Sequence, residues 1–214
     1  LGTVNANGTQ DLIAYLFTKS GRVETTNYKT VKLPTDKNVP EYTKDVFGDF
    51  YKSLFGHVVD ENEMHAVVTE YAWNLAISCD PCSADPIIPE LKGLGVWWVN
   101  NIDDYHSFDG GVGFVTRLHV RYDREHFPED LVFQETQDSS NYQGRYIIQH
   151  PFTGEMTCTQ AGPYQQAVWK RQRAEADTLA ELTGWRVDDV RKKMKLADAP
   201  PEVKGDSWFD KLWR

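Results

Sequence analysis

The sequence predicts an α+β fold with a mostly antiparallel sheet, one helix after the first hairpin and two helices toward the C-terminus. Segments rich in strand-forming residues, separated by turn residues, predict the sheet. An apolar period of about four residues at 40–55 and a second helical period from residue 162 predict the helices. We expect one domain over residues 1–196 and a tail over residues 197–214.

The first two strands are expected at residues 11–18 and 22–33. Both segments are rich in strand formers, and the turn residues between them predict a hairpin around Ser20 and Gly21. Residues 64–77 favour a long strand, although their Ala, Met, Glu and Leu content leaves a helix as the alternative. Further strands are expected at 96–99, 112–122, 131–135 and 142–149, the first of them inside a long irregular segment at 78–107.

Three helices are expected. Tyr42, Val46, Phe50 and Leu54 recur every four residues, which predicts an amphipathic helix over residues 40–55 with a proline in its first turn. The helical period that begins near residue 162 ends at Gly184, a residue typical of helix C-termini. A short helix is expected to follow over residues 187–194.

The expected strand at 112–122 has two unlike faces. One face is predicted to be core: Val112, Phe114, Thr116, Leu118, Val120 and Tyr122. The other face carries the row Arg117, His119 and Arg121. We expect this row to pair with carboxylates on or just before the next strand: Glu129, Asp130 and Glu135.

The alternative for this strand is a metal site formed by His119, Asp123 and His126. On an extended chain His119 and Asp123 would stand about 13 Å apart, at roughly 3.3 Å per residue, and could not bind one ion. His126 follows in a loop and could fold back. Cross-strand charge pairing is therefore the favoured interpretation.

Three cysteines allow a disulfide. Cys79-Asp-Pro-Cys82 has the spacing of a thiol–disulfide exchange motif, but the prolines that follow it block the helix that would activate the first thiol. We expect a structural disulfide, either between Cys79 and Cys82 or from one of them to Cys158. Redox chemistry, free thiols and metal-bound thiols remain as alternatives.

An acidic loop is the candidate for calcium. Asp103, Asp104 and Asp109, with the neighbouring Asn100 and Asn101, supply oxygen ligands of the kind calcium prefers. They lack the spacing of an EF-hand loop, so a solvated loop is favoured. Apart from this calcium alternative we expect no cofactor.

The tail ends in an aromatic segment. Trp208, Phe209, Leu212 and Trp213 would share one face of a short helix. Such a docking segment could pack on its own domain or on a neighbouring subunit. Few basic residues flank it, which makes a membrane-surface role the weaker alternative.

Composition excludes several classes of function. The chain has 214 residues, a formal net charge of −9 and a pI near 5.1, which disfavours nucleic acid as a partner. No apolar run approaches the roughly 20 residues needed to span a bilayer. Seven Trp and ten Tyr residues suit an assembly subunit, because their rings bury large areas and keep a polar tip.

The charged strand also carries a family resemblance. Phe114-Val-Thr-Arg-Leu-His-Val-Arg-Tyr122, followed by Glu129-Asp-Leu-Val-Phe133, resembles the signature of a bacterial family of uncharacterised, usually exported proteins. Residues 21–34, 69–73, 79–82 and 141–146 add to the resemblance, which covers most of residues 1–195. The chain is similar to the C-terminal part of such a protein, whose N-terminal region carries an export signal and further cysteines.

The resemblance implies a location in the periplasm, on the outer surface or outside a bacterial cell, and it transfers no catalytic residue. We therefore expect a non-enzymatic envelope or extracellular protein, or a subunit of a larger surface assembly. Its partner would be another protein or its own N-terminal fragment. The alternatives are a periplasmic thiol–disulfide oxidoreductase that uses Cys79 and Cys82, and a calcium- or carbohydrate-binding module that uses Trp97, Trp98 and the acidic loop.

Overall fold

The computed structural model describes residues 7–74, 88–98 and 113–201. The chain divides into two compact units, each drawn from two stretches of sequence. Unit 1 comprises Leu1–Thr35 and Val58–Gly144, and unit 2 comprises Asp36–His57 and Arg145–Arg214. The single domain expected over residues 1–196 stays a prediction.

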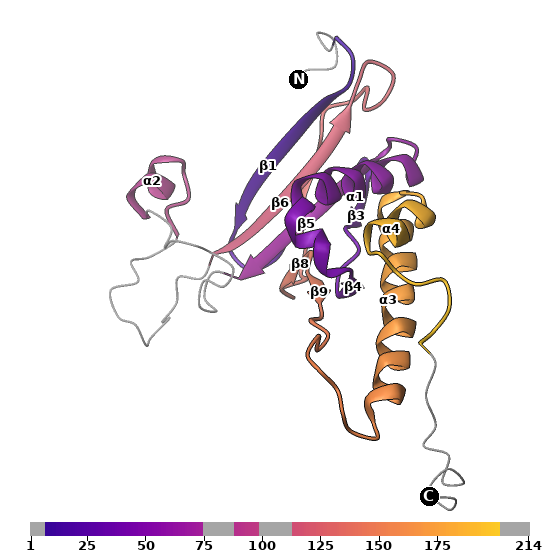
Figure 1. Ribbon diagram of the computed structural model, residues 1–214. Helices are drawn as coiled ribbons and strands as arrows, with labels where there is room; N and C mark the ends of the chain where they lie inside the picture. Colours follow the sequence, from indigo (N-terminus) through magenta and orange to yellow (C-terminus); the bar gives the residue numbers. More distant parts are fainter. Residues whose placement is uncertain (1–6, 75–87, 99–112, 202–214) are drawn as a thin grey trace, which may run out of the picture. The chain divides into compact units, whose positions relative to one another are not determined.

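The main element of unit 1 is a five-stranded sheet in which β1, β6, β5 and β3 lie in that order and β8 also pairs with β5 (Figure 1). Its strands are β1 (Gln10–Thr18), β3 (Lys29–Lys32), β5 (Ala66–Asn74), β6 (Phe114–Tyr122) and β8 (Tyr142–Gln143). All neighbours are antiparallel except β3, which is parallel to β5. The mostly antiparallel sheet with its helices confirms the α+β class.

The remaining elements of unit 1 are a two-stranded ladder and a short helix. The strands β2 (Val23–Thr25) and β7 (Phe133–Glu135) pair antiparallel. The helix α2 (Ile88–Gly93) had no counterpart among the sequence predictions. The strand expected at 96–99 is absent over the described residues 96–98, which form turns after α2.

The predicted hairpin around Ser20 and Gly21 is wrong. β1 pairs with β6, β2 with β7 and β3 with β5, so the first strands do not pair with each other. A Cβ atom on Gly21 would lie 1.9 Å from the carbonyl oxygen of Thr136. The glycine therefore permits a close approach of two backbones. From the sequence alone, a glycine required for this reason cannot be distinguished from a glycine in a turn.

The core of unit 1 lies on the predicted face of β6. Leu118 and Val120 cluster with Val67 and Phe127, and Phe114 clusters with Ala72 and Tyr142. On the opposite face Val115 and His119 are also buried, although the sequence pattern assigned this face to the charged row. β6 is thus covered on both faces along part of its length.

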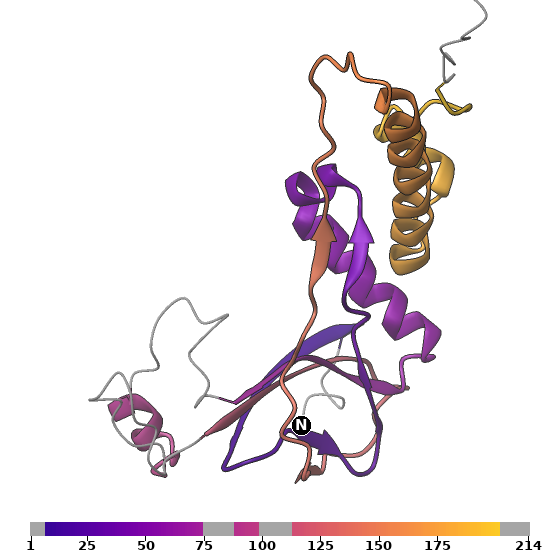
Figure 2. The same ribbon diagram turned by 90° about the horizontal axis from the view of Figure 1, so that it is seen from below.

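Unit 2 combines a two-stranded parallel ladder with helices. Figure 2 shows β4 (Lys37–Val39) and β9 (Tyr146–Ile148) side by side and pointing the same way. A 3-10 helix, η2 (Glu41–Val46), runs directly into α1 (Phe47–Glu61), whose last turn belongs to unit 1. The helix α3 (Ala161–Thr183) packs against α4 (Val187–Lys193) and β4. Buried side chains of this unit include Val39, Phe50, Leu54, Leu179 and Val190.

The expected helices are present with small shifts at their ends. The helix predicted at 40–55 begins as a 3-10 turn and extends to Glu61. α3 ends as predicted at Gly184, which has φ 69° and donates its backbone N–H to the carbonyl of Ala180. No helix among the described residues has the length and apolarity required to cross a membrane.

Candidate functional site

The charged row of β6 lies between β1 and β5, and the flanking strands supply its partners. The register between β5 and β6 shifts between Thr69 and Tyr71, which marks a β-bulge. Glu70 is the additional residue of the bulge, so that Glu70 and Tyr71 both lie beside Arg117. The bulge is the local feature that brings a carboxylate and a tyrosine to the same point of the sheet.

Glu70 is the centre of this charged cluster. One carboxylate oxygen, Oε1, lies 2.7 Å from Nδ1 of His119, and the other, Oε2, lies 2.7 Å from Nε of Arg117. The Glu70 side chain is only 4% exposed and that of His119 only 9%, whereas Arg117 is one-third exposed. One end of the ion pair is therefore buried and the other reaches solvent.

Asp11 of β1 completes the cluster. Arg121 donates from Nε and Nη2 to the two Asp11 oxygens, at 2.8 and 3.0 Å. These hydrogen bonds hold the pKa of Asp11 below its usual value. Nε2 of His119 lies 3.8 Å from Asp11, so the imidazole stands between two carboxylates. Besides the imidazole, the cluster thus sets two carboxylates, of Asp11 and Glu70, against two guanidinium groups, of Arg117 and Arg121.

The partners predicted for the row were wrong. β7 pairs with β2, while the neighbours of β6 are β1 and β5, so the carboxylates beside the row are Asp11 and Glu70. Glu135 instead accepts hydrogen bonds from the backbone amides of Ser20 and Gly21, at 3.0 and 3.1 Å. Glu70 lies within the strand that was predicted at residues 64–77. The order of the strands in the sheet, which makes Glu70 a neighbour of the row, could not be predicted from the sequence.

His119 and His126 have separate carboxylates. Asp123 accepts from Nδ1 of His126 at 2.7 Å and from the backbone amides of Glu125 and His126. These hydrogen bonds lower the pKa of Asp123, and the bond from the His126 side chain has the largest effect. Within the described part of the chain, no group of three or more His, Cys, Asp or Glu residues is arranged to hold a metal ion.

Apolar and aromatic side chains surround the charged cluster. The β1–β6 register places Ile13 opposite His119 and Tyr15 opposite Arg117. Tyr15 is 59% exposed, and the Arg117 guanidinium lies 5.5 Å from the centre of its ring. Next to Arg117, Tyr71 lies parallel to Trp73 with ring centres 6.3 Å apart. This face of the sheet presents an apolar rim around internally paired charges.

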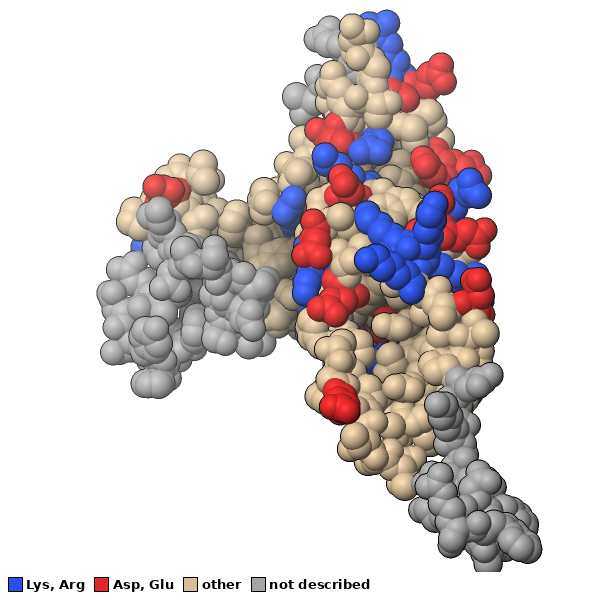
Figure 3. All heavy atoms as spheres, viewed as in Figure 1, with Lys and Arg blue, Asp and Glu red and all other residues tan. Residues whose placement is uncertain are grey.

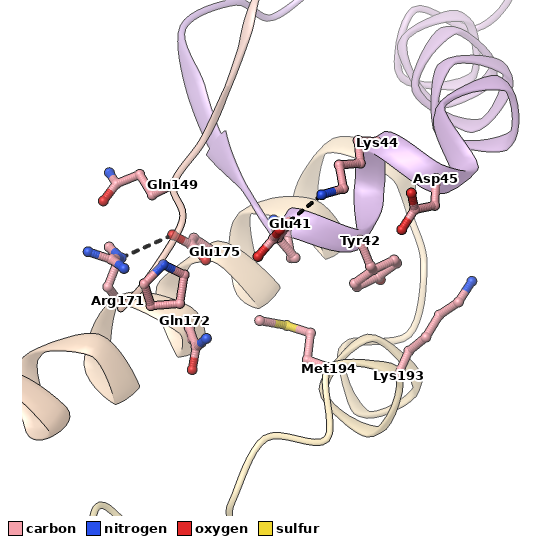
Figure 4. A pocket seen from close by; sticks show the side chains of 12 residues that line it. Glu41, Tyr42, Lys44, Asp45, Gln149, Arg171, Gln172, Glu175, Lys193 and Met194 are labelled. Carbon is pink, nitrogen blue, oxygen red and sulfur yellow. Dashed lines mark hydrogen bonds and ion pairs between the residues drawn. The ribbon is translucent and has the colours of Figure 1, made fainter. Parts of the chain in front are cut away.

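A separate polar pocket lies within unit 2 (Figure 4). It has a volume of about 300 Å³ and is bounded by η2, the middle of α3, the end of α4 and the segment after β9. Glu175 is 95% buried, and its Oε1 lies 3.4 Å from Nε of Arg171. Burial raises the pKa of Glu175, and the charge of Arg171 offsets this only in part.

The charges of this pocket balance one another. Its wall holds three carboxylates and three cations: Glu41, Asp45, Glu175, Lys44, Arg171 and Lys193. Lys44 is paired with Glu41 at 2.9 Å, and the Lys193 ammonium lies 5.1 Å from the Tyr42 ring. The pocket thus selects neither anions nor cations by charge. Sequence reasoning missed it, because the spacing of Arg171 and Glu175 is ordinary on a helix surface.

Several predicted site residues lie outside the described residues: Cys79, Cys82, Asp103, Asp104, Asp109, Trp208, Phe209, Leu212 and Trp213. Cys158 is exposed. The disulfide, the calcium loop and the docking segment therefore stay predictions, as does redox chemistry at Cys79 and Cys82. Of the two tryptophans in the glycan alternative, Trp97 is exposed and Trp98 donates its indole N–H to the carbonyl of Thr18.

Comparison with protein families identified the family of this chain. The model of DUF2330, described as an uncharacterised protein conserved in bacteria, matches residues 1–134. No curated protein and no solved structure matches the chain. The matched residues contain β1, β5 and β6, and with them every residue of the charged cluster.

Proposed function

The chain belongs to the bacterial DUF2330 family, and we propose that it is a non-enzymatic protein of the cell envelope or the cell exterior. It acts by contact with another protein chain, as a subunit of a surface assembly. Its location is the periplasm, the outer surface or the surrounding medium. The support comes from one feature of the sheet in unit 1, the exposed apolar edge strand β1.

β1 is the outermost strand at one edge of the five-stranded sheet, and β6 is the described strand with which it pairs. Three of its apolar side chains are widely exposed: Leu12 at 42%, Ile13 at 43% and Tyr15 at 59%. Natural proteins usually shorten, charge or cover such an edge, because it can recruit another strand. An exposed apolar edge strand supports binding by strand addition.

The charged cluster supports a non-enzymatic role. Glu70 is held by His119 and Arg117, and Asp11 is held by Arg121. Carboxylates engaged in this way can fix the strands against one another, as in structural ion-pair networks. The cluster is better explained as a structural support for the β1 edge.

The distribution of charge favours a protein partner. The net charge is −9, and basic and acidic side chains are interspersed on the face drawn in Figure 3. With this net negative charge, the molecule as a whole would repel a phosphate backbone.

The location is tested by fractionating the native bacterium that expresses the protein from its own gene with a C-terminal tag. We expect the protein in the periplasmic, outer-surface or secreted fraction, with a cytoplasmic enzyme as the fractionation control. Retention with the cytoplasmic control would contradict the proposed location.

Binding through β1 is tested in the same cells with a photo-crosslinking amino acid. At Tyr15 it should yield a discrete crosslinked protein product, because this side chain lies on the exposed edge. The control is Tyr164 on α3, a tyrosine that is also exposed. Equal labelling from both positions, or none from Tyr15, would oppose binding through β1.

A further inference from the structure

We propose that the partner of β1 is the β1 strand of a second copy of this chain, paired antiparallel about Tyr15. This inference rests on the proposed binding function and identifies the partner. It would join two five-stranded sheets into one continuous sheet through a two-fold contact.

The first argument is the conflict between the composition of β1 and its position. Residues Leu12 to Phe17 form an unbroken apolar run. Such runs are typical of strands that are buried on both faces, whereas an edge strand with one solvated face alternates apolar and polar residues. β1 nevertheless lies at the edge of the described sheet. A second strand beside it would make β1 a central strand, as its composition indicates.

The second argument is that both faces of β1 are incompletely covered. Ile13 and Tyr15 lie on the face of His119 and Arg117, according to the register with β6. Leu12 lies opposite Val120, on the other face of the same strand. All three side chains are more than 40% exposed. A neighbouring strand would cover side chains on both faces at once, which a ligand on one face could not do.

The third argument is charge complementarity, which selects one register. Antiparallel pairing about Tyr15, continued one residue past the end of β1, places Asp11 of each copy opposite Lys19 of the other. The Lys19 ammonium lies 5.8 Å from the centre of the Trp97 ring, and in this register it would also face a carboxylate, so that two pairs of opposite charges form. The same register sets Ile13 opposite Phe17. The Asp11 side chain is 41% exposed although Arg121 binds it, so it remains accessible to a second cation. A shift by one residue would face Asp11 with Thr18 and lose both charge pairs.

Two tyrosines meet at the two-fold axis in this register. Directly opposed residues of antiparallel strands have Cβ atoms about 5 Å apart, and aromatic pairs at such positions are favourable. Tyr15 is therefore the residue at which pairing of two copies can be detected most directly.

Cysteine crosslinking tests the register. Tyr15→Cys is introduced into the full chain with Cys79, Cys82 and Cys158 replaced by serine, and circular dichroism confirms folding. Mild oxidation should convert most of this variant into a disulfide-linked dimer. The matched control is Leu12→Cys, which is also exposed. In the proposed register two Leu12 positions stand about 20 Å apart, six residues along the strand, and should not crosslink.

Sedimentation of the full chain without cysteine changes tests the charge pairs. Lys19→Glu places a glutamate opposite Asp11 at both ends of the contact, and we expect the dimer dissociation constant to rise about tenfold. Lys37→Glu, on β4 of unit 2, changes the net charge equally without altering β1 or its flanking residues, and should leave the constant unchanged.

Two results would overturn the inference. One is a chain that stays monomeric at high concentration, and the other is crosslinking of Leu12→Cys as readily as Tyr15→Cys, which indicates unspecific edge association. If the chain is monomeric but Tyr15 still captures a different protein in cells, the inference fails while the proposed function stands. If the protein is cytoplasmic but pairs through Tyr15, the inference stands and the proposed location fails.

Discussion

Glu70 is the residue on which the charged cluster of β5 and β6 depends. Its buried carboxylate pairs with both Arg117 and His119. Glu70→Ala should lower the free energy of unfolding by about 2–3 kcal/mol, somewhat less than is typical for a broken buried pair, because Arg117 is one-third exposed. Glu70→Gln keeps hydrogen-bonding capacity and should cost less. Urea unfolding monitored by circular dichroism measures both values.

The control for Glu70 is Glu125→Ala, in an exposed loop of the same unit. Exposed substitutions of this kind change stability by no more than about 0.5 kcal/mol. An equal effect of Glu70→Ala and Glu125→Ala would show that the cluster contributes little to stability.

Substitution of Glu175 should change the free energy of unfolding in the opposite direction from substitution of Glu70. Burial raises the pKa of this carboxyl, so its contribution to stability is present in acid and is lost as the pH rises through the folded-state pKa. At neutral pH the buried charged form lowers the stability of the fold, and the ion pair with Arg171 offsets this loss only in part. Glu175→Gln removes this cost and should raise the free energy of unfolding at pH 7, by on the order of 1 kcal/mol.

The gain from Glu175→Gln should shrink below the folded-state pKa, where the native carboxyl is already neutral. Urea unfolding at pH 7 and at pH 4 measures this difference. Glu181→Gln, at an exposed position on the same helix, is the control and should show no gain at either pH. Destabilisation by Glu175→Gln at pH 7 would mean that the ion pair with Arg171 outweighs the burial of the charge.

At the level of elements, the sequence predicted which segments are regular and was less informative about which segments pair. α3 and its stop at Gly184 follow from a local period and a local conformational preference. The pairing of β1 with β6 joins segments about 100 residues apart and has no local signal. The false hairpin at Gly21 shows the same limit, because local residues identified a glycine but not the Thr136 backbone that requires it.

The Gly184 stop gives a prediction with an internal control. Its φ of 69° disfavours any residue with a Cβ, and an added Cβ would lie 3.3 Å from the His57 ring. Gly184→Ala should therefore cost about 1–2 kcal/mol. Gly48→Ala, in α1, meets no atom within 4 Å and should stabilise by about 0.5–1 kcal/mol. Thermal and urea unfolding would contradict the assignment if both substitutions had the same sign.

At the scale of the whole molecule, the basic residues of the candidate site could be predicted from the sequence, but their partners could not. The row Arg117, His119 and Arg121 was expected to pair with Glu129, Asp130 or Glu135, whereas in the structure it pairs with Glu70 and Asp11. The partners Asp11 and Glu70 depend on the order of strands, a property of the complete sheet. The apolar run of β1 was visible from the start, but its exposure at an edge became visible only when all strands were placed.

The response to acid is also a property of the whole chain, because several carboxylates are hydrogen-bonded in the folded state. Hydrogen bonds lower the pKa values of Asp11, Glu135 and Asp138, with the Arg121, Ser20 and Ser140 groups as the respective largest causes. A lowered folded-state pKa stabilises the fold above the unfolded-state value, about 4 for these groups, and this contribution is lost as the pH falls through the folded-state value. We expect nearly constant stability at mildly acidic pH and a steep loss below about pH 4.

Glu135→Gln isolates one part of this acid response. The carboxylate accepts the amides of Ser20 and Gly21, and an uncharged amide oxygen accepts them less strongly. Because Glu135 is exposed, the loss at pH 7 should be no more than about 0.5 kcal/mol, and it should vanish in acid, where the native side chain is also neutral. Glu129→Gln, an exposed position before β7, should show no such pH dependence. If the free energy of unfolding differed between Glu135→Gln and the native chain by the same amount at every pH, the effect would come from packing and not from charge. Glu135 would then not be one of the groups whose protonation destabilises the fold in acid.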